Sequence, residues 1–345
     1  MEKQDRRVVN IALQGGGTHG AFSWGVLDRL LEDDRIAIEG ISGTSAGAMN
    51  AALLVQAFHQ GGAEAARAQL SRFWHRMSEI SDLNPIRRNC YDMITGDWNL
   101  DRSPAALMIE LTNLFFSPYQ LNPANYTRMR VLLEEFIDVP TLRAAEPFRL
   151  FVAATNVRSG LPRIFSREEI TIDALMASSC VPTTYQAVEI DGEAYWDGGY
   201  SGNPPLWPLI YQCESPDVVI VEINPMRREH LPYTGLEIMS RMGEITFNAS
   251  YLWQLRAISL VGRLVDEPGA TGPGINWIRK RHLLLHRIKA EEMERLGAVS
   301  QANTELEFLY YLRDLGRKTA ADWLAENIDA INQRSTFDPA AVFQM

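Results

Sequence analysis

The chain has 345 residues, of which 46% are hydrophobic and 22% charged, and its formal net charge is −10. These values are typical of a folded globular protein and argue against wholesale disorder. General nucleic-acid binders are usually basic, so the acidic charge argues against nucleic acid as a partner. The length fits one large α/β domain or two smaller ones.

The cysteine content indicates the redox compartment, and the hydropathy indicates whether the chain can span a membrane. Cys90, Cys180 and Cys213 lie far apart, are odd in number and form no CxxC pair, so neither a disulfide framework nor a zinc site is expected. The longest apolar-rich run, residues 46–58, is shorter than the roughly 20 residues that span a bilayer. We expect a cytoplasmic protein that contacts membranes at most peripherally. Residues 279–281, Arg-Lys-Arg, are the best basic patch for such contact, although a solvated helix or strand end explains them better.

The first part of the chain alternates short apolar runs with helical patterns. Residues 8–13 predict a buried strand, and an amphipathic helix follows the glycines at 15–17. Residues 36–42 predict a second strand, and residues 46–60 predict a buried helix that Gly61-Gly62 closes. This order predicts an α/β fold in which helices cover both faces of a parallel sheet.

Two further parallel strands are expected at residues 150–155 and 218–223, with a hairpin between them. The hairpin pairs residues 187–190 with residues 194–196 around the turn Asp191-Gly192. Residues 62–145 read as a helical insertion, in which Ser103-Pro104 and Asn122-Pro123 each start a helix.

The C-terminal part, residues 226–345, is predicted to be mainly helical. We expect a long helix at 236–264, a strand at 283–288 and two helices around Gly316. We interpret residues 1–225 as the catalytic core, including the insertion at 62–145, and residues 226–345 as an extension packed on it.

The glycine-rich turn Gly15-Gly16-Gly17-Thr18-His19-Gly20 has more than one interpretation. It fits G-x-G-x-x-G between a strand and a helix, and Glu39 follows about 20 residues later, as in dinucleotide-binding folds. Its backbone N–H groups and the helix N-terminus would attract either a stable phosphate or a transient oxyanion. The motif alone leaves open a nucleotide-binding module using Gly15–Gly20, a catalytic loop and a turn without ligand.

The pentapeptide Gly43-Thr44-Ser45-Ala46-Gly47 favours catalysis. It fits G-x-S-x-G between a strand and a buried helix, the context of a nucleophile elbow. Small residues at Gly43 and Gly47 avoid clashes in the sharp turn, and the helix N-terminus stabilises negative charge near Ser45. Ser45 is therefore the candidate nucleophile of a serine esterase, and the N–H groups of Gly15, Gly16 and Gly17 are candidates for its oxyanion hole.

The base has two candidates at this point. A triad in the order Ser, Asp, His would need His230, His282 or His286, and none has surroundings that suggest catalysis. Asp197 follows the predicted strand that ends at Trp196 and precedes Gly198-Gly199, which leaves its carboxylate accessible, although Asp-Gly turns are common. A Ser-His-Asp esterase therefore stays open beside a Ser-Asp pair.

The three motifs, in this order and spacing, resemble the patatin-like phospholipase family over residues 8–225. The resemblance implies a three-layer α/β/α fold with a mainly parallel sheet and helical additions. It implies a Ser45–Asp197 dyad without catalytic histidine, an oxyanion hole at Gly15–Gly17, and supporting roles for the motif glycines Gly43, Gly47, Gly198 and Gly199. It further implies hydrolysis of a phospholipid or lysophospholipid ester through an acyl-enzyme, with no metal or other cofactor.

Some points stay open beside the resemblance. His19 stands where many family members carry Arg or Lys, so its role is undecided. Transfer of the acyl group to an alcohol instead of water is an alternative on the same elbow. We expect one of the helical additions to form a lid or an interfacial face, with Trp98 and Phe115-Phe116 as its lipid contacts.

Overall fold

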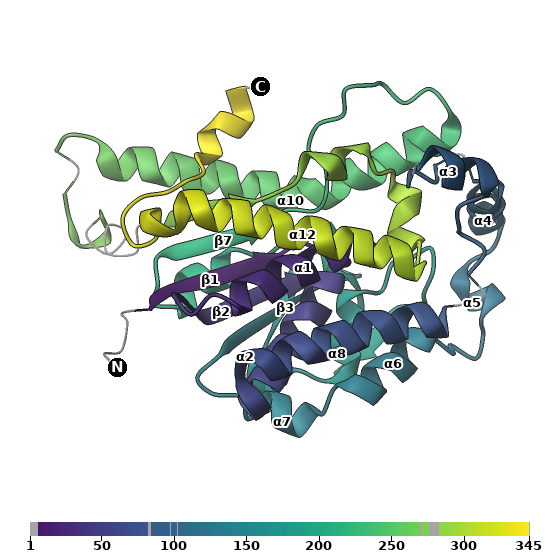
Figure 1. Ribbon diagram of the computed structural model, residues 1–345, viewed down its shortest axis with the longest axis horizontal. Helices are drawn as coiled ribbons and strands as arrows, with labels where there is room; N and C mark the ends of the chain where they lie inside the picture. The colour runs from purple at the N-terminus through teal and green to yellow at the C-terminus, as the bar shows by residue number, and fades with distance from the viewer. Residues whose placement is uncertain are drawn as a thin grey trace.

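The computed structural model describes residues 6–81, 84–96, 98–101, 103–269, 271–275 and 283–344 (Figure 1). Its centre is a mixed sheet in the order β5-β6-β3-β2-β1-β7-β8, with β4 paired to β3. The neighbours β3 (Arg149–Asn156), β2 (Ile36–Thr44), β1 (Arg7–Leu13), β7 (Asp217–Val221) and β8 (Leu284–Ile288) are all parallel. The strands β4 (Pro162–Ser166), β5 (Val188–Ile190) and β6 (Glu193–Asp197) pair antiparallel. The expected mainly parallel α/β sheet is confirmed.

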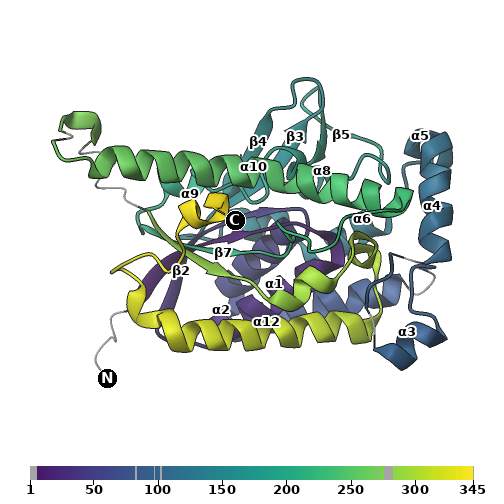
Figure 2. The ribbon, with the colours of Figure 1, turned by 90° about the horizontal axis from the view of Figure 1, so that it is seen from above.

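Helices cover both faces of the sheet, as Figure 2 shows from above. The helices α1 (Gly20–Leu31), α2 (Ala46–Ile80), α8 (Ile172–Ser178) and α12 (Leu306–Asn327) share one apolar core with one face of the strands. On the other face, α9 (Trp207–Gln212) and α10 (Gly235–Asp266) enclose a second core. Successive strand residues belong to opposite cores: Val219 and Val221 of β7 face the first, and Val218 and Ile220 face the second. This alternation defines three layers.

The helical insertion between β2 and β3 begins with the second half of α2. Gly61 and Gly62 both have non-helical backbone angles, with a φ of 72° at Gly62, so the glycine pair ends the first helical stretch of α2 as predicted, and a second stretch follows after the kink. Beyond the bend the chain packs back on the first half, where the Trp74 indole donates to Asn50 Oδ1 at 2.9 Å. The helices α3 (Cys90–Thr95), α4 (Pro104–Phe115), α5 (Pro118–Leu121), α6 (Arg128–Phe136) and α7 (Val139–Arg143) follow.

Two predicted element boundaries were wrong. Asn122-Pro123 starts no helix, because Asn122 ends α5 and its Oδ1 accepts the Tyr126 N–H, which makes a loop before α6. Gly316 does not separate two helices but lies inside α12. A Cβ there would stand 2.1 Å from the Phe22 carbonyl oxygen, so the glycine permits α12 to approach α1 closely.

Other predicted elements can be compared directly with the structure. The helix expected after Ser103 begins at Pro104, and the strand expected near residue 283 is β8, an edge strand of the central sheet. No strand was predicted where β4 lies. No helix in the described ranges is long and apolar enough to cross a membrane. The basic run at 279–281 and His282 lie outside the described residues.

Candidate functional site

Ser45 occupies a sharp turn between the end of β2 and the start of α2. Its φ of 53° lies in the left-handed region, which costs a residue with a side chain on the order of 1–3 kcal/mol and is concentrated at functional sites. The turn is tight, because a Cβ at Gly43 would stand 2.6 Å from the Gly47 backbone, and one at Gly47 would stand 2.5 Å from the Leu13 oxygen. The Ser45 N–H donates to Ser178 Oγ at 2.9 Å, which fixes the turn from α8.

Asp197 ends β6 and is fully buried. Its N–H donates to the Cys180 carbonyl at 2.8 Å, and its Oδ1 accepts the Gly199 N–H at 2.7 Å. Its Oδ2 makes no hydrogen bond to any residue that the structure describes. Burial raises the pKa of Asp197 to about 7, and the hydrogen bond from Gly199 and the nearby Ser45 hydroxyl oppose this rise. The carboxylate is therefore held near the point of proton exchange at neutral pH.

The sheet register brings Ser45 and Asp197 to the two sides of β3. Thr44, just before Ser45, pairs with Ala153, and Asp197 pairs with the next residue, Ala154. The Ser45 side chain lies close enough to lower the pKa of Asp197, yet its hydroxyl and Oδ2 do not meet the geometry of a full hydrogen bond. Catalytic hydrogen bonds are often long before substrate binds, so the arrangement suits proton transfer from Ser45 to Asp197.

The glycines of the aspartate motif also permit close packing. A Cβ at Gly198 would stand 2.3 Å from the Ala153 oxygen, and one at Gly199 would stand 2.2 Å from the Phe247 ring of α10. A larger residue at Gly198 would displace the backbone next to Asp197, and one at Gly199 would displace that backbone or the Phe247 ring.

The glycine loop lies directly against Ser45. A Cβ at Gly15 would stand 2.6 Å from the Ser45 Cβ. The Gly15 N–H, however, already donates to Asn203 Oδ1 at 2.7 Å, so it is not free to bind an oxyanion. The N–H groups of Gly16 and Gly17 have no hydrogen-bond partner among the described residues. Gly17 has a φ of 55°, a conformation that glycine adopts without strain.

Buried amide side chains hold this loop in place. Gln14 Oε1 accepts the N–H groups of Ile223 and Asn224, each at 2.9 Å, and Asn224 Nδ2 donates to the Gly15 carbonyl at 2.6 Å. Asn203 accepts from the Gly15 N–H and donates to the Gly15 carbonyl at 3.3 Å. Gln14 and Asn224 were not predicted, because their only sequence signal is an amide residue close after a strand end.

His19 is a buried neutral group. Its Nε2 lies 2.8 Å from Ser300 Oγ, and burial, assisted by the Arg228 charge, lowers the pKa of His19 to about 3. It therefore supplies no positive charge beside the glycine loop at neutral pH. The neighbouring Gln301 packs on the loop as well, since a Cβ at Gly17 would stand 2.2 Å from its carbonyl oxygen.

The late histidines that the structure describes do not face Asp197. His230 is exposed, and His286 is buried against Asp217, with Nε2 2.8 Å from Oδ1. Asp217 begins β7, whereas Ser45 follows the carboxyl end of β2. By the strand register these two ends are about 20 Å apart at 3.3 Å per residue. His286 is thus a structural partner of Asp217.

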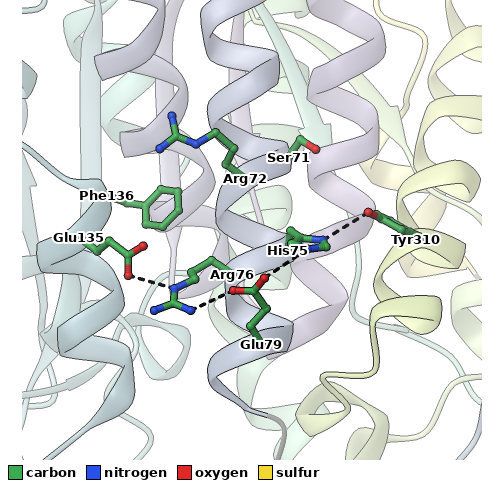
Figure 3. A pocket seen from close by; sticks show the side chains of 8 residues that line it. All are labelled: Ser71, Arg72, His75, Arg76, Glu79, Glu135, Phe136 and Tyr310. Carbon is green, nitrogen blue, oxygen red and sulfur yellow. Dashed lines mark hydrogen bonds and ion pairs between the residues drawn. The ribbon is translucent and has the colours of Figure 1, made fainter.

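A hollow of about 380 Å³ lies elsewhere, between α2, α6 and α12 (Figure 3). Its lining contains neither Ser45 nor Asp197. Arg76 Nη1 and Nε pair with Glu79 and Glu135 at 2.9 Å and 3.1 Å, and with Arg72 the arginines and glutamates of the lining balance in formal charge. Among the described residues, no group of acidic, histidine and cysteine side chains could hold a metal ion.

Comparison with known proteins identifies a family model that covers most of this region. A family model described as patatin-like phospholipase matches residues 11–210, which include Ser45, Asp197 and the glycine loop. Among solved structures, VipD from Legionella pneumophila aligns with a TM-score of 0.38 and 12% identity, over 92% of this chain and 67% of that one. No curated protein sequence matches the chain.

Proposed function

The chain belongs to the patatin-like phospholipase family, which implies lipid acyl hydrolase activity, and from this premise we propose that Ser45 and Asp197 hydrolyse lipid esters through an acyl-enzyme. One observation carries the proposal: a serine with a left-handed φ lies beside a buried carboxylate whose Oδ2 has no other partner among the described residues. A carboxylate with an unused oxygen and a pKa of about 7 is suited to be a general base at neutral pH.

In the proposed first step, Asp197 Oδ2 accepts the Ser45 proton as Oγ attacks the ester carbonyl carbon. Negative charge then develops on the carbonyl oxygen, and the free N–H groups of Gly16 and Gly17 stabilise it, together with the N-terminus of α2. The leaving alcohol takes the proton from Asp197, which leaves an acyl group on Ser45.

In the second step, Asp197 removes a proton from water, whose oxygen attacks the acyl carbon; the bond to Ser45 Oγ breaks, the fatty acid leaves, and Asp197 returns the proton to Oγ. Gly15 contributes by close approach and not as a donor, because Asn203 occupies its N–H. The proposed substrate is a phospholipid or lysophospholipid ester, and no cofactor takes part in these steps.

The test measures hydrolysis of a short-chain p-nitrophenyl ester and labelling by a fluorophosphonate probe. We expect Ser45→Ala to abolish both hydrolysis and labelling. Asp197→Asn should lower kcat by at least about 10³-fold, in the range lost when a proton acceptor is removed. His230→Ala is the matched control, because this exposed side chain can be truncated without disturbing the core.

A folded Asp197→Asn variant that keeps full activity would overturn the proposed base. Loss of activity in His230→Ala would favour a Ser-His-Asp enzyme. Product analysis with added alcohol separates the two fates of the acyl-enzyme, since free acid indicates hydrolysis and a new ester indicates transfer.

A further inference from the structure

The carbonyl group of Gly15 accepts hydrogen bonds from two side-chain amides at once. Asn224 Nδ2 donates to it at 2.6 Å and Asn203 Nδ2 at 3.3 Å. Both asparagines are buried, and Asn203 Oδ1 also accepts the Gly15 N–H at 2.7 Å. Buried side chains therefore hold both backbone groups of Gly15, the glycine that lies against Ser45.

The two asparagines are themselves fixed by further hydrogen bonds. Asn224 Oδ1 accepts Gln301 Nε2 at 3.2 Å, and the Asn224 N–H donates to Gln14 Oε1 at 2.9 Å. The Asn203 N–H donates to Ser250 Oγ at 3.2 Å, and its carbonyl accepts Gln14 Nε2 at 3.3 Å. Neither amide can turn away from Gly15 without losing its other partners, so the direction of the Gly15 carbonyl is set by the surrounding fold.

The direction of this carbonyl also sets the direction of the Gly16 N–H. Every cis peptide bond of the described residues precedes a proline, so the bond between Gly15 and Gly16 is trans. In a planar trans peptide the C=O and N–H bonds point in opposite directions. The Gly16 N–H therefore points away from the two amides, and it has no hydrogen-bond partner among the described residues.

Hydrogen bonds to a peptide carbonyl also polarise the N–H of the same peptide, which makes it a stronger donor. The peptide of the Gly16 N–H receives two side-chain amides at its carbonyl. In the next peptide, which carries the Gly17 N–H, the Gly16 carbonyl accepts one bond from the described residues, the His19 N–H at 3.1 Å. The Gly16 N–H is thus the better oriented and more strongly polarised of the two free donors.

We propose that Asn224 and Asn203 are positioning residues that aim and polarise the Gly16 N–H, which makes it the principal donor to the oxyanion. This proposal rests on the proposed function, because an oxyanion forms only if Ser45 attacks an ester. Neither asparagine touches the reacting atoms in this arrangement. They act through the Gly15–Gly16 peptide, and the contribution of each appears only when charge develops on the carbonyl oxygen of the substrate.

The variant Asn224→Leu removes the shorter of the two amide bonds and leaves the buried groups around it with partners. The Gly15 carbonyl keeps Asn203, and Gln14 Oε1 keeps the Ile223 N–H. Gln301 is partly exposed and can turn to water. We therefore expect this variant to fold.

The test compares a short-chain p-nitrophenyl ester with its thiono analogue, in which sulfur replaces the carbonyl oxygen. Sulfur is a weak hydrogen-bond acceptor, so oxyanion donors contribute little to cleavage of the thiono ester. We expect Asn224→Leu to lower kcat/KM for the oxygen ester by at least about tenfold, mainly through kcat, whereas loss of a whole donor costs about 10²–10³-fold. The thiono ester should change by less than about twofold, so the preference for oxygen over sulfur falls.

The matched control is Asn50→Leu. Asn50 is also fully buried, and its Nδ2 donates to a glycine carbonyl, that of Gly20, at 2.8 Å. This variant should lose stability, yet its preference for the oxygen ester should stay within about twofold of the wild type. Should Asn224→Leu fail to fold, Gln301→Ala removes the donor to Asn224 Oδ1 and should lower the preference by about twofold to tenfold.

Nuclear magnetic resonance tests the polarisation without any substrate. Labelling glycine alone with ¹³C at the carbonyl and ¹⁵N at the amide selects the Gly-Gly peptides of the sequence, which are Gly15-Gly16, Gly16-Gly17, Gly61-Gly62 and Gly198-Gly199. In Asn224→Leu, the Gly15 carbonyl and Gly16 amide resonances should move upfield, because the carbonyl loses a hydrogen bond. The resonances of Gly61-Gly62, at the kink of α2, should not move and serve as the internal control.

Two results would overturn the proposal. Equal losses on the oxygen and thiono esters would show that Asn224 only supports the fold, and unchanged Gly15-Gly16 resonances would show that it does not polarise this peptide. Failure of the proposed function looks different: the wild type would cleave neither ester and resist the fluorophosphonate probe, while the resonances would still shift in Asn224→Leu.

Discussion

Replacing Asp197 by asparagine should make the stability of the fold less sensitive to pH. In the wild type, burial raises the pKa of Asp197 from 3.8 to about 7. Between these values the folded protein keeps a proton that the unfolded chain has released. The stabilising effect of this proton is therefore complete below pH 3.8 and is lost progressively as the pH rises to about 7.

The size of the effect follows from the difference between the two pKa values. A shift of one pKa unit corresponds to about 1.4 kcal/mol, so the wild type should lose about 2–3 kcal/mol of unfolding free energy from this group between pH 5 and pH 8. Asparagine does not titrate and can still accept the Gly199 N–H. Its buried amide introduces a cost of about 1–3 kcal/mol that does not depend on pH.

Urea unfolding of both proteins at pH 5 and pH 8 tests this reasoning. The unfolding free energy of the variant minus that of the wild type should rise by about 2–3 kcal/mol from the lower to the higher pH. Asp191→Asn, on the exposed turn between β5 and β6, controls for the loss of one carboxylate. A difference that is the same at both pH values would show that Asp197 is ionised throughout, and the burial argument would be wrong.

Two further predictions test the base and the packing. Because Asp197 must be ionised to accept the Ser45 proton, kcat/KM for the soluble ester should rise through a pKa of about 7 and then level off, and a profile already level at pH 5 would contradict this. Gly316→Ala should lower the unfolding free energy by about 1–3 kcal/mol, because its Cβ would stand 2.1 Å from the Phe22 oxygen. Gly243→Ala, in α10 with open space around it, should instead raise it by up to about 1 kcal/mol, and equal effects in urea unfolding would refute the packing argument.

Local patterns were sufficient for the parallel strands and for the positions of the main motifs. The β-rich runs that predicted β1, β2, β3 and β7 are short and bounded by glycine or polar residues, so their type and their positions in the chain could be predicted. The strand–turn–helix context at Ser45 was equally visible, because an elbow needs small residues within two positions of the serine.

Other features depend on contacts between distant segments and left no such signal. Gly316 looks like a helix breaker until α1 is placed against it, and Trp98 looks like a free aromatic group. In the structure the Trp98 ring stacks with Tyr311 at 5.8 Å between centroids, and its centroid lies 3.4 Å from the Arg88 guanidinium carbon, so the ring packs on the protein, and its contact with lipid stays a prediction. Phe115 and Phe116, predicted with it, are 73% and 50% exposed, and their contact with lipid stays a prediction.

In the proposed oxyanion loop, too, the sequence does not show which backbone N–H groups are already hydrogen-bonded. From the motif, the N–H groups of Gly15, Gly16 and Gly17 were equally good candidates for the oxyanion hole. Asn203, almost 190 residues further along the chain, accepts the N–H of Gly15. The undecided role of His19 likewise depended on Ser300 and on burial, which together make it a neutral packing residue. Sequence identified the loop, and tertiary contacts decide which of its donors are free.

Contacts between residues 226–345 and the proposed site bear on the predicted division into a catalytic core and an extension. The family match ends at residue 210, but Phe247 packs on Gly199, and Ser300 and Gln301 cover His19 and Gly17. The strand β8 pairs along β7 over all five residues of each strand. A chain ending near residue 225 would expose β7 as an unprotected edge and would leave the glycine loop and the Asp197 turn without the side chains that pack on them. The geometry of the proposed site therefore depends on the C-terminal part. We expect residues 1–225 and residues 226–345 to fold together and not as two independent domains.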